Sequence, residues 1–223
     1  MREAIADTLP LGVGVALSPV PIIAVVLMLV SRRASVNGPA FLTGWVLGLA
    51  AVGVVVLGVA GPSDASDHGE PATWAAVLQL VVGAFLVVVA TRQWRSRPRE
   101  GAEPAMPKWM RAIDSFTPLR ALGVGALLSG LNPKNLLLAV AAATAIAQTG
   151  VSGRDQAIAY AVFVAIGTVG VAVPVTIFFT VGDRAPILLE GLRAWMARHN
   201  AAIMATLCLV IGAKLIGDGV AGL

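Results

Sequence analysis

Apolar stretches of about 20 residues recur along the whole sequence, separated by short segments that hold most of the charged side chains. A stretch of this length crosses the roughly 30 Å hydrocarbon core of a bilayer as an α-helix. Because these stretches are apolar on all sides rather than at every second residue, they predict helices and not strands. We therefore expect an all-α, polytopic membrane protein with six spans, at residues 9–30, 39–60, 73–91, 121–148, 157–181 and 201–217.

The composition fits a protein that lies almost entirely in the membrane. Of the 223 residues, 57% are hydrophobic and 13% are charged, against about 25% charged residues in soluble domains. The longest polar segment, residues 92–120, has the prolines and charges of a linker with one short interfacial helix at most. We expect a single transmembrane domain over residues 1–223. Basic residues that flank the spans explain the high pI, so nucleic acid is not an expected partner.

The basic residues are distributed unevenly between the two sides of the predicted bundle. Twelve Lys and Arg residues fall on one side, seven of them between residues 92 and 120, and three fall on the other side when Lys214 is included. Segment 62–71 on the second side contains three acidic residues and no Lys or Arg. Since Lys and Arg concentrate in cytoplasmic loops, we expect a multi-pass protein of the inner (plasma) membrane with both termini outside.

Two parts of the chain resemble each other. Residues 11–18 read LGVGVALS and residues 122–129 read LGVGALLS, identical at six of eight positions with an offset of 111. LQLVVGAFL at 78–86 is echoed by LCLVIGAKL at 207–215, and the second and fifth spans match weakly through Gly48 and Gly167. Three spans separate each segment from its copy, so the copies face opposite directions. We predict two inverted three-helix repeats, at about residues 8–91 and 121–220, an arrangement typical of transporters.

Prolines interrupt the first and fourth spans near their middles. Ser18-Pro19-Val20-Pro21 lies about ten residues into the first span, and Asn132-Pro133 about twelve residues into the fourth. Proline removes a backbone donor and clashes with the preceding turn, so we expect each helix to end and restart there. Ser18 and Asn132 are the expected N-caps, with Pro19 and Pro133 at the first helical position.

The restarted helices of an inverted pair point their N-terminal ends toward each other near the midplane. Each end carries roughly half a positive charge and free N–H groups, which suits an anion. Lys134 adds a full charge, and because a lysine at mid-bilayer costs at least about 2.5 kcal/mol, it should face a cavity or a partner. The alternative is a proline kink whose polar side chains only re-satisfy freed backbone groups. The expected substrate-binding residues are Ser18, Pro19, Pro21, Ser129, Asn132, Pro133, Lys134 and Asn135.

Two further polar features have simple expected roles. The single cysteine, Cys208, excludes an internal disulfide and is expected to pack between helices. Lys214 and Asp218 lie four residues apart on one helix face, so we expect an ion pair or snorkelling at the outer surface.

These motifs resemble a known group of membrane proteins. Asn132-Pro133-Lys134 at the start of an apolar helix, the Pro-x-Pro at 19–21, six spans and a charged central loop resemble the lysine-exporter (LysE) superfamily. Within it, LSGLNPKNLLLAVAAATAIAQ and GVGVALSPVPIIAVVLML are most similar to the GAP family of sulfolipid- and glycopeptidolipid-addressing proteins. The resemblance implies a protein that assists the export of a small polar solute or, in the GAP branch, of cell-envelope glycolipids.

The chain departs from other branches of this superfamily. Its amino-acid exporters usually have glycine between the two prolines, where this chain has Val20. Its thiol-redox carriers have paired cysteines within the membrane, and its metal exporters have acidic or histidine ligands in their spans. The sequence lacks both features, which weakens these three substrate classes.

The sequence therefore favours a transporter or flippase-like export factor for a cell-envelope glycolipid or another anionic or polar lipid. The alternatives are an exporter of small amino-acid-like solutes and a non-transporting scaffold subunit of an envelope-synthesis complex. We expect no enzymatic activity, no cofactor and no metal site, because no cluster with catalytic or ligand spacing occurs in or beside the spans. The expected partners are the bilayer, the lipid or an anionic small molecule, and envelope-lipid biosynthesis or export proteins. A homodimer is left open.

Overall fold

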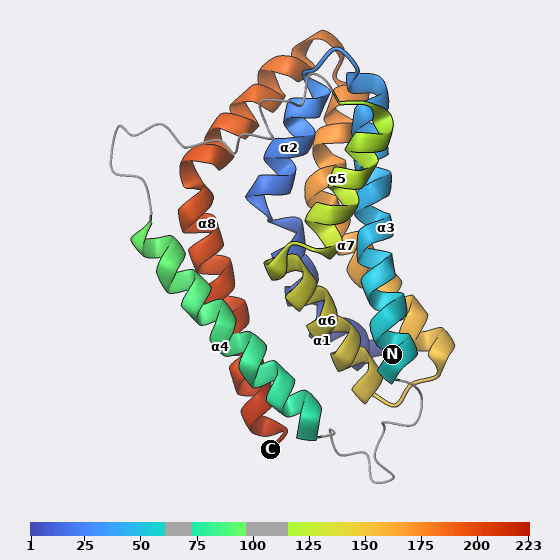
Figure 1. The fold of residues 1–223 in the computed structure, drawn as a ribbon, viewed down its shortest axis with the longest axis vertical. Helices are drawn as coiled ribbons and strands as arrows, with labels where there is room; N and C mark the ends of the chain where they lie inside the picture. Colours follow the sequence, from blue (N-terminus) through green and yellow to red (C-terminus); the bar gives the residue numbers. More distant parts are fainter. Residues whose placement is uncertain (61–72, 97–115) are drawn as a thin grey trace.

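The computed structural model describes residues 1–60, 73–96 and 116–223, and every regular element in these ranges is a helix (Figure 1). This confirms the all-α prediction. In chain order the elements are α1 (Arg2–Ala16), α2 (Pro19–Leu29), α3 (Ala34–Ala60), α4 (Thr73–Arg95), α5 (Pro118–Gly130), α6 (Pro133–Gln148), α7 (Gly153–Thr180), a short 3-10 helix (Gly182–Arg184) and α8 (Ala185–Ala221).

Two pairs of short helices take the place of two predicted spans. α1 and α2 are bent by 51° and α5 and α6 by 61°, and each pair together is apolar and long enough to cross a bilayer. α3, α4, α7 and α8 are each long enough alone, so the described residues contain six candidate spans when each bent pair counts as one. The predicted breaks are confirmed. The interfacial helix considered for residues 92–120 lies largely outside the described residues, which end at 96 and resume at 116.

The last helix is longer than predicted. The prediction placed the final span at 201–217, with the preceding residues in a loop, but α8 runs without interruption from Ala185 to Ala221. At 1.5 Å per residue its 37 residues reach about 55 Å, well beyond the bilayer core. In its first half Leu189 is buried, whereas Glu190 forms an ion pair with Arg193. The charged segment therefore belongs to an amphipathic part of the same helix.

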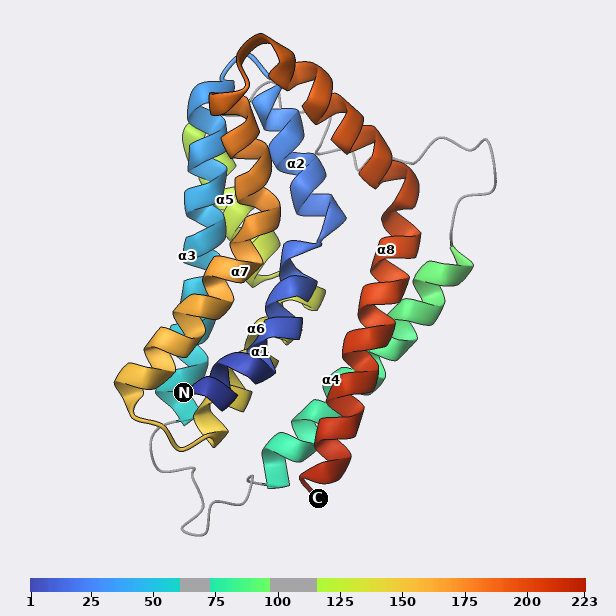
Figure 2. The ribbon, with the colours of Figure 1, turned by 180° about the vertical axis from the view of Figure 1, so that it is seen from behind.

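Three helix pairs form the frame of the molecule: α4 with α8, α3 with α5, and α1 with α7. Figure 2 shows α4 and α8 lying along one another on one side of the other helices. α2 contacts α8, and α6 contacts α4. The second helices of the two broken spans, α2 and α6, thus lie between the α4–α8 pair and the α3–α5–α7 group.

Aromatic side chains join α3 to α7. The Trp45 indole N–H donates to the Gly167 carbonyl at 3.3 Å, and the Tyr160 hydroxyl donates to the Leu49 carbonyl at 2.9 Å. Phe163 is fully buried beside them. Because a buried Trp or Tyr polar group is costly without a partner, these bonds fix how α3 and α7 pack.

The backbones of α3 and α5 approach so closely that the contact requires glycine. A Cβ atom at Gly44 would overlap the carbonyl group of Leu122, and one at Gly125 would overlap the carbonyl of Phe41. Small residues that let backbones touch are a main source of helix association in membranes. Gly58, near the end of α3, has open space in the direction of a Cβ atom.

Gly44→Ala is therefore expected to lower the free energy of unfolding by about 1–3 kcal/mol, since the added methyl group forces α3 away from α5. Gly58→Ala makes the same change on the same helix and should leave stability unchanged or raise it by up to about 1 kcal/mol through better helix propensity. Thermal unfolding of both variants in the same lipid nanodiscs measures the difference. Equal midpoints would contradict a tight α3–α5 contact.

Candidate functional site

Each broken span changes from one helix to the next over a few residues. α1 gives way to α2 at Pro19, after an extended Ser18 (φ −80°, ψ 108°), and α5 gives way to α6 at Pro133, after Asn132 (φ −64°, ψ 122°). Proline suits the first helical position because its missing N–H would have had no partner within the helix. Pro19 and Pro133 occupy the positions predicted for them.

The residues before these prolines use their side chains differently. The Asn132 side-chain oxygen accepts from the backbone N–H of Lys134 at 3.2 Å, which confirms the predicted cap. Ser18 occupies the N-cap position of α2, but its side chain makes no capping bond to that helix. The prediction of a side-chain cap at Ser18 is wrong, because its hydroxyl bonds instead to the other broken span.

A chain of buried hydrogen bonds joins the two breaks; we call it the central network. The Lys134 ammonium donates to the Gly14 carbonyl and to the Ser18 hydroxyl oxygen, both at 2.6 Å. The Ser18 hydroxyl donates to Asn135 Oδ1 at 2.9 Å, and the Asn135 amide donates to the Leu128 carbonyl at 3.0 Å. Residues 116 positions apart in the sequence are thereby linked.

The two carbonyl groups of the central network lie at the broken helix ends. Gly14 and Leu128 each stand two residues before the end of their helix, α1 or α5. The backbone N–H groups four residues later bond to other carbonyls. The last carbonyls of a helix need outside partners, which within a membrane must come from the protein. Lys134 and Asn135 supply them, so both side chains have a structural role.

The net charge around the two breaks is positive. Lys134 is 7% exposed, and the two ion pairs among the described residues, both on α8, do not include it. The ends of α1 and α5 each contribute roughly half a negative charge and the starts of α2 and α6 roughly half a positive charge. These helix contributions nearly cancel, so the ammonium charge is left over.

Five of the predicted site residues lie outside the central network: Pro19, Pro21, Ser129, Asn132 and Pro133. Ser129 is buried against Gly48 of α3, and its hydroxyl donates to the Ala126 carbonyl at 3.1 Å. Pro21 is buried in the first turn of α2. Pro133 begins α6 and is exposed. The structure thus brings Ser18, Lys134 and Asn135 together, with Pro19 and Asn132 beside them at the helix starts.

A polar pocket that the sequence analysis missed lies where α1, α4, α6 and α8 meet, at the end of the molecule that holds the C-terminus (Figure 1). This outer pocket has a volume of about 410 Å³. Its polar lining includes Glu3, Asp7, Gln79, Gln148, Lys214 and Asp218. Lys214 and Asp218 form the predicted ion pair. The available sequence signal was the spacing of four residues between charges near both termini, which places each pair on one helix face.

Two apolar side chains separate the outer pocket from the central network. On α6, Leu138 lies one turn after Lys134, and Ala141, almost one turn further, lines the pocket. The tips of Leu138 and of Ile211 on α8 pack against Gly14, whose carbonyl accepts from Lys134. Leu138 and Ile211 are only 1% and 4% exposed. The order along the bundle is therefore the central network, an apolar layer and the outer pocket.

The apolar spans and the two broken helices define a multi-pass α-helical membrane protein. A family model described as Sap, sulfolipid-1-addressing protein, matches residues 8–221. The chain belongs to this sulfolipid-1-addressing protein family, which confirms the resemblance to sulfolipid-addressing proteins. No match was found among curated proteins or among solved structures.

Replacing Ser18 by alanine should lower the free energy of unfolding more than replacing Asn132 by alanine. Ser18→Ala takes an acceptor from Lys134 and a donor from Asn135, so two buried groups lose a partner and we expect a loss of about 2–4 kcal/mol. Asn132→Ala removes one cap bond and should cost about 1 kcal/mol. Thermal unfolding in nanodiscs compares the variants. A smaller loss for Ser18→Ala than for Asn132→Ala would contradict the central network.

Proposed function

We propose that this protein is a transporter or flippase-like export factor of the plasma (inner) membrane for a cell-envelope glycolipid or another anionic or polar lipid. The observation that carries the proposal is the buried Lys134 ammonium, which has two hydrogen bonds but no carboxylate partner among the described residues. The family description, which refers to a sulfolipid, supports an anionic headgroup. Envelope-lipid biosynthesis or export proteins are the proposed protein partners.

Anion binding at Lys134 is compatible with the central network. An ammonium group has three N–H donors, and Gly14 and Ser18 accept from two of them. The third donor is available to an anionic group of the lipid. Because the contributions of the helix ends at the two breaks nearly cancel, the ammonium charge itself supplies the attraction for the anion. The network therefore holds the ammonium in place while leaving capacity for a ligand.

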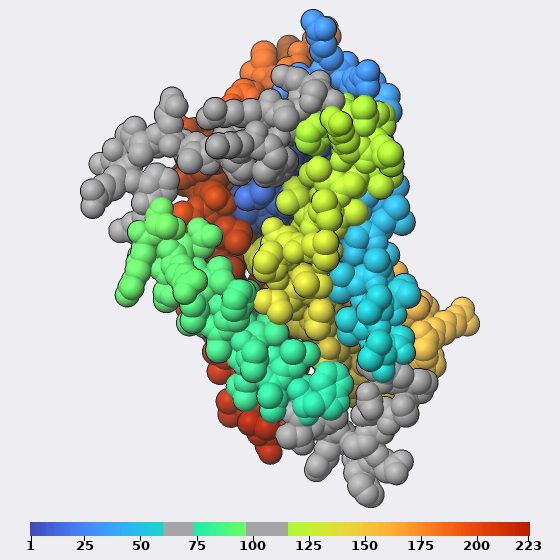
Figure 3. Space-filling view, viewed as in Figure 1, coloured from blue at the N-terminus to red at the C-terminus, as the bar shows by residue number. Residues whose placement is uncertain are grey.

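The lipid headgroup enters from the side in this proposal. Figure 3 shows α2, in blue, at the bottom of a recess between α8 and α5. A headgroup can enter such a recess while its acyl chains stay in the bilayer. Leu138 and Ile211 close the way toward the outer pocket, so release on that side requires them to separate.

We infer that the two halves, about residues 8–91 and 121–220, are inverted repeats with the α4–α8 contact on their symmetry axis. Gly83 and Gly212 are equivalent positions in the echoed segments LQLVVGAFL and LCLVIGAKL. A Cβ atom at either glycine would meet the carbonyl oxygen of the other. Residues on a two-fold axis pack against their own equivalents in this way.

A second pair of contacts supports the same inference. Gly48 of α3 packs on Ala126 of α5, and Gly167 of α7 packs on Val15 of α1. Val15 and Ala126 are related by the offset of 111, and Gly48 and Gly167 are the glycines matched between the second and fifth spans. In inverted-repeat transporters the ligand site lies between the halves, where this chain has Lys134.

We also infer that the family belongs to the LysE superfamily. The two motifs on which that resemblance rests, Pro-x-Pro at 19–21 and Asn132-Pro133-Lys134, both stand at the breaks of the broken spans. Their shared position supports a common architecture rather than a chance similarity of apolar sequence.

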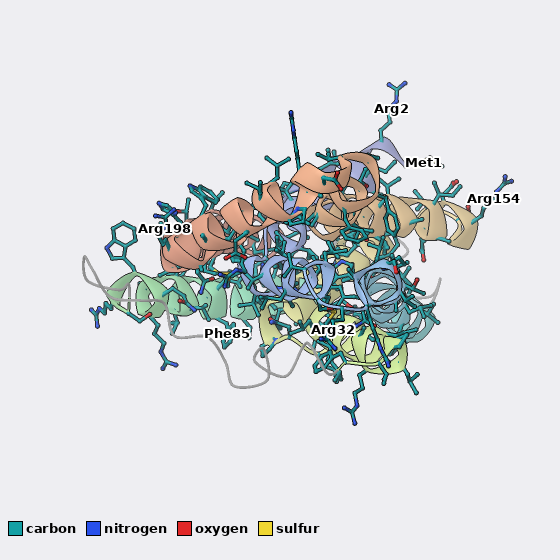
Figure 4. The ribbon with its side chains drawn as sticks, turned by 90° about the horizontal axis from the view of Figure 1, so that it is seen from above. Met1, Arg2, Arg32, Phe85, Arg154 and Arg198 are labelled. Atoms are coloured by element: carbon teal, nitrogen blue, oxygen red, sulfur yellow. The ribbon has the colours of Figure 1, made fainter. Side chains whose placement is uncertain are left out.

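The proposed orientation places both termini outside the cell. Figure 1 shows the α2–α3 and α7–α8 junctions at one end of the long axis and the C-terminus and the α6–α7 junction toward the other. Arg32 and Arg33 lie at the first end, which agrees with the charge count. The side chains of Arg2 and Arg154 project away from the bundle (Figure 4).

Cysteine labelling in intact cells tests this orientation in a Cys208→Ser background. Gly153→Cys, at the exposed start of α7 with open space around it, should react with an impermeant maleimide added outside. Ser96→Cys, exposed at the end of α4, should react only after the membrane is permeabilised. The reverse pattern would show that the termini are cytoplasmic.

The central test compares movement of two fluorescent lipids across proteoliposome membranes, one with a sulfated sugar headgroup and one with the same headgroup without sulfate. The wild-type protein should move the sulfated lipid faster. Lys134→Gln replaces the ammonium group by a neutral amide, which still donates hydrogen bonds but carries no charge. This variant should move the sulfated lipid at least about tenfold more slowly and should no longer prefer it to the lipid without sulfate. Arg154→Gln removes an exposed positive charge and serves as the control with unchanged transport.

The outcomes separate the alternatives. Full transport by Lys134→Gln would end the anion-site proposal. If the wild-type protein moves neither lipid but releases lysine from loaded liposomes, the amino-acid exporter is favoured. If it moves none of these compounds, the scaffold alternative is favoured.

A further inference from the structure

α4 and α8 pack tightly around one pair of glycines and leave a groove near the end of α4. A Cβ atom at Gly83 or at Gly212 would meet the carbonyl oxygen of the other glycine. Figure 1 and Figure 2 both show the end of α4 diverging from α8 beyond this contact. The space between the helices there has a volume of about 380 Å³. We call it the α4–α8 groove, and its lining residues are Ala90, Thr91, Trp94, Arg95, Ala205, Thr206 and Leu209.

The α4–α8 groove combines an apolar surface with one charged residue. Ala90 and Ala205 are only 4% and 5% exposed, and Leu209 and the ring of Trp94 add further apolar surface. Arg95, the last residue of α4, is the charged residue of the lining and is exposed. Tryptophan and arginine at the end of a span typically lie at the level of the lipid headgroups. The apolar part of the groove is therefore suited to a hydrocarbon chain and the end of α4 to a headgroup.

Two polar side chains of the groove have unused hydrogen-bonding capacity. Within the described residues, the Arg95 guanidinium group makes no hydrogen bond or ion pair, and the Thr206 hydroxyl makes no hydrogen bond. A threonine hydroxyl in a membrane helix usually donates to a carbonyl in the preceding turn, as Thr91 and Thr176 do. Arg95 and Thr206 are therefore available as donors to a ligand in the groove.

The charges around the groove favour an anionic group. The described lining contains no acidic residue. Arg92 is exposed one turn before Arg95 on α4, and Arg198 lies two turns before Ala205 on the same side of α8. Figure 4 shows Arg198 on the side of the bundle where α4 lies. Since a guanidinium group matches the geometry of a phosphate, a phosphate beside Arg95 would be held directly and attracted by the other two arginines.

We propose that the α4–α8 groove binds a phospholipid of the bilayer that carries an anionic headgroup. An acyl chain lies along Ala90, Ala205 and Leu209, the phosphate accepts from Arg95, and an ester oxygen accepts from Thr206. Basic pockets between transmembrane helices recognise anionic headgroups in this way. The bound lipid fills the space between the two helices and thereby stabilises their packing.

This lipid site is separate from the site proposed for transport. No residue of the α4–α8 groove belongs to the central network. The proposal therefore does not require that Lys134 binds an anion or that the protein moves a lipid across the membrane.

Three probes test the proposal: dioleoyl phosphatidylglycerol, which is anionic, dioleoyl phosphatidylcholine, which has the same chains and no net charge, and glycerol phosphate, which has no chains. The full chain in a neutral detergent should bind phosphatidylglycerol saturably and at least about fivefold more tightly than phosphatidylcholine, measured by native mass spectrometry. Glycerol phosphate should not bind at the same concentrations. Its binding as tightly as phosphatidylglycerol would show a site for a free anion and overturn the proposal.

Variants locate the bound lipid. Arg95→Gln should weaken phosphatidylglycerol binding roughly five- to tenfold and leave phosphatidylcholine binding unchanged, because it removes the charge but not the apolar surface. Arg33→Gln removes an exposed positive charge outside the groove, at the α2–α3 junction, and should bind both lipids as the wild type does. Thr206→Trp fills the groove from an exposed position and should weaken the binding of both phospholipids.

Lys134→Gln should bind phosphatidylglycerol as tightly as the wild type, so failure of the central site and failure of the α4–α8 groove are distinguishable. Equal binding of the two phospholipids by the wild type would overturn the proposal. So would an equal loss of phosphatidylglycerol binding in Arg33→Gln and Arg95→Gln, or unchanged binding in Thr206→Trp. Loss of binding in Lys134→Gln with full binding in Arg95→Gln would place the lipid at the central network instead.

Discussion

A transmembrane helix that stops inside the bilayer leaves backbone carbonyl groups that water does not reach, and the protein must supply their partners. Two spans of this chain stop in this way, at the ends of α1 and α5. Asn135 satisfies the carbonyl of Leu128 within its own broken span, whereas Lys134 satisfies that of Gly14 in the other half of the chain. Each break is stable because of a neighbouring side chain, and the break in α1 depends on the second half of the protein.

The comparison of Lys134 with Asn135 bears directly on function. Both side chains cap a helix carbonyl, but Asn135 does so without burying a charge. A lysine near the centre of the membrane costs at least about 2.5 kcal/mol on insertion scales, and hydrogen bonds to a charged group return about 1.5–3 kcal/mol each. Capping alone does not require the charge, since the neutral amide performs the same task a few ångströms away. We therefore propose that the charge serves an anionic ligand and that the apolar layer of Leu138 and Ile211 closes that site on the outer side.

Features that depend on local chemistry were predictable from the sequence. Apolar length predicted the spans, and Pro19 and Pro133 predicted the breaks, because proline disrupts a helix whatever surrounds it. The hydrogen bond from Ser18 to Asn135 was not predictable. A serine hydroxyl can bond to a backbone N–H group of its own helix or to a distant side-chain amide, and the tertiary structure decides between the two. The length of α8 was underestimated, because charged residues mark the edge of the bilayer but do not end a helix. The outer pocket has no motif, since it is assembled from four helices that lie far apart in the sequence.

The most direct measurement is an experimental structure of the protein in nanodiscs with a sulfated glycolipid bound. The headgroup anion is predicted to lie within hydrogen-bond distance of Lys134 Nζ and close to the starts of α2 and α6, while the bonds from Lys134 to Gly14 and Ser18 are kept. A structure in which the anion lies elsewhere, with Lys134 bonded only to Gly14 and Ser18, would contradict the assignment and reduce Lys134 to a helix cap.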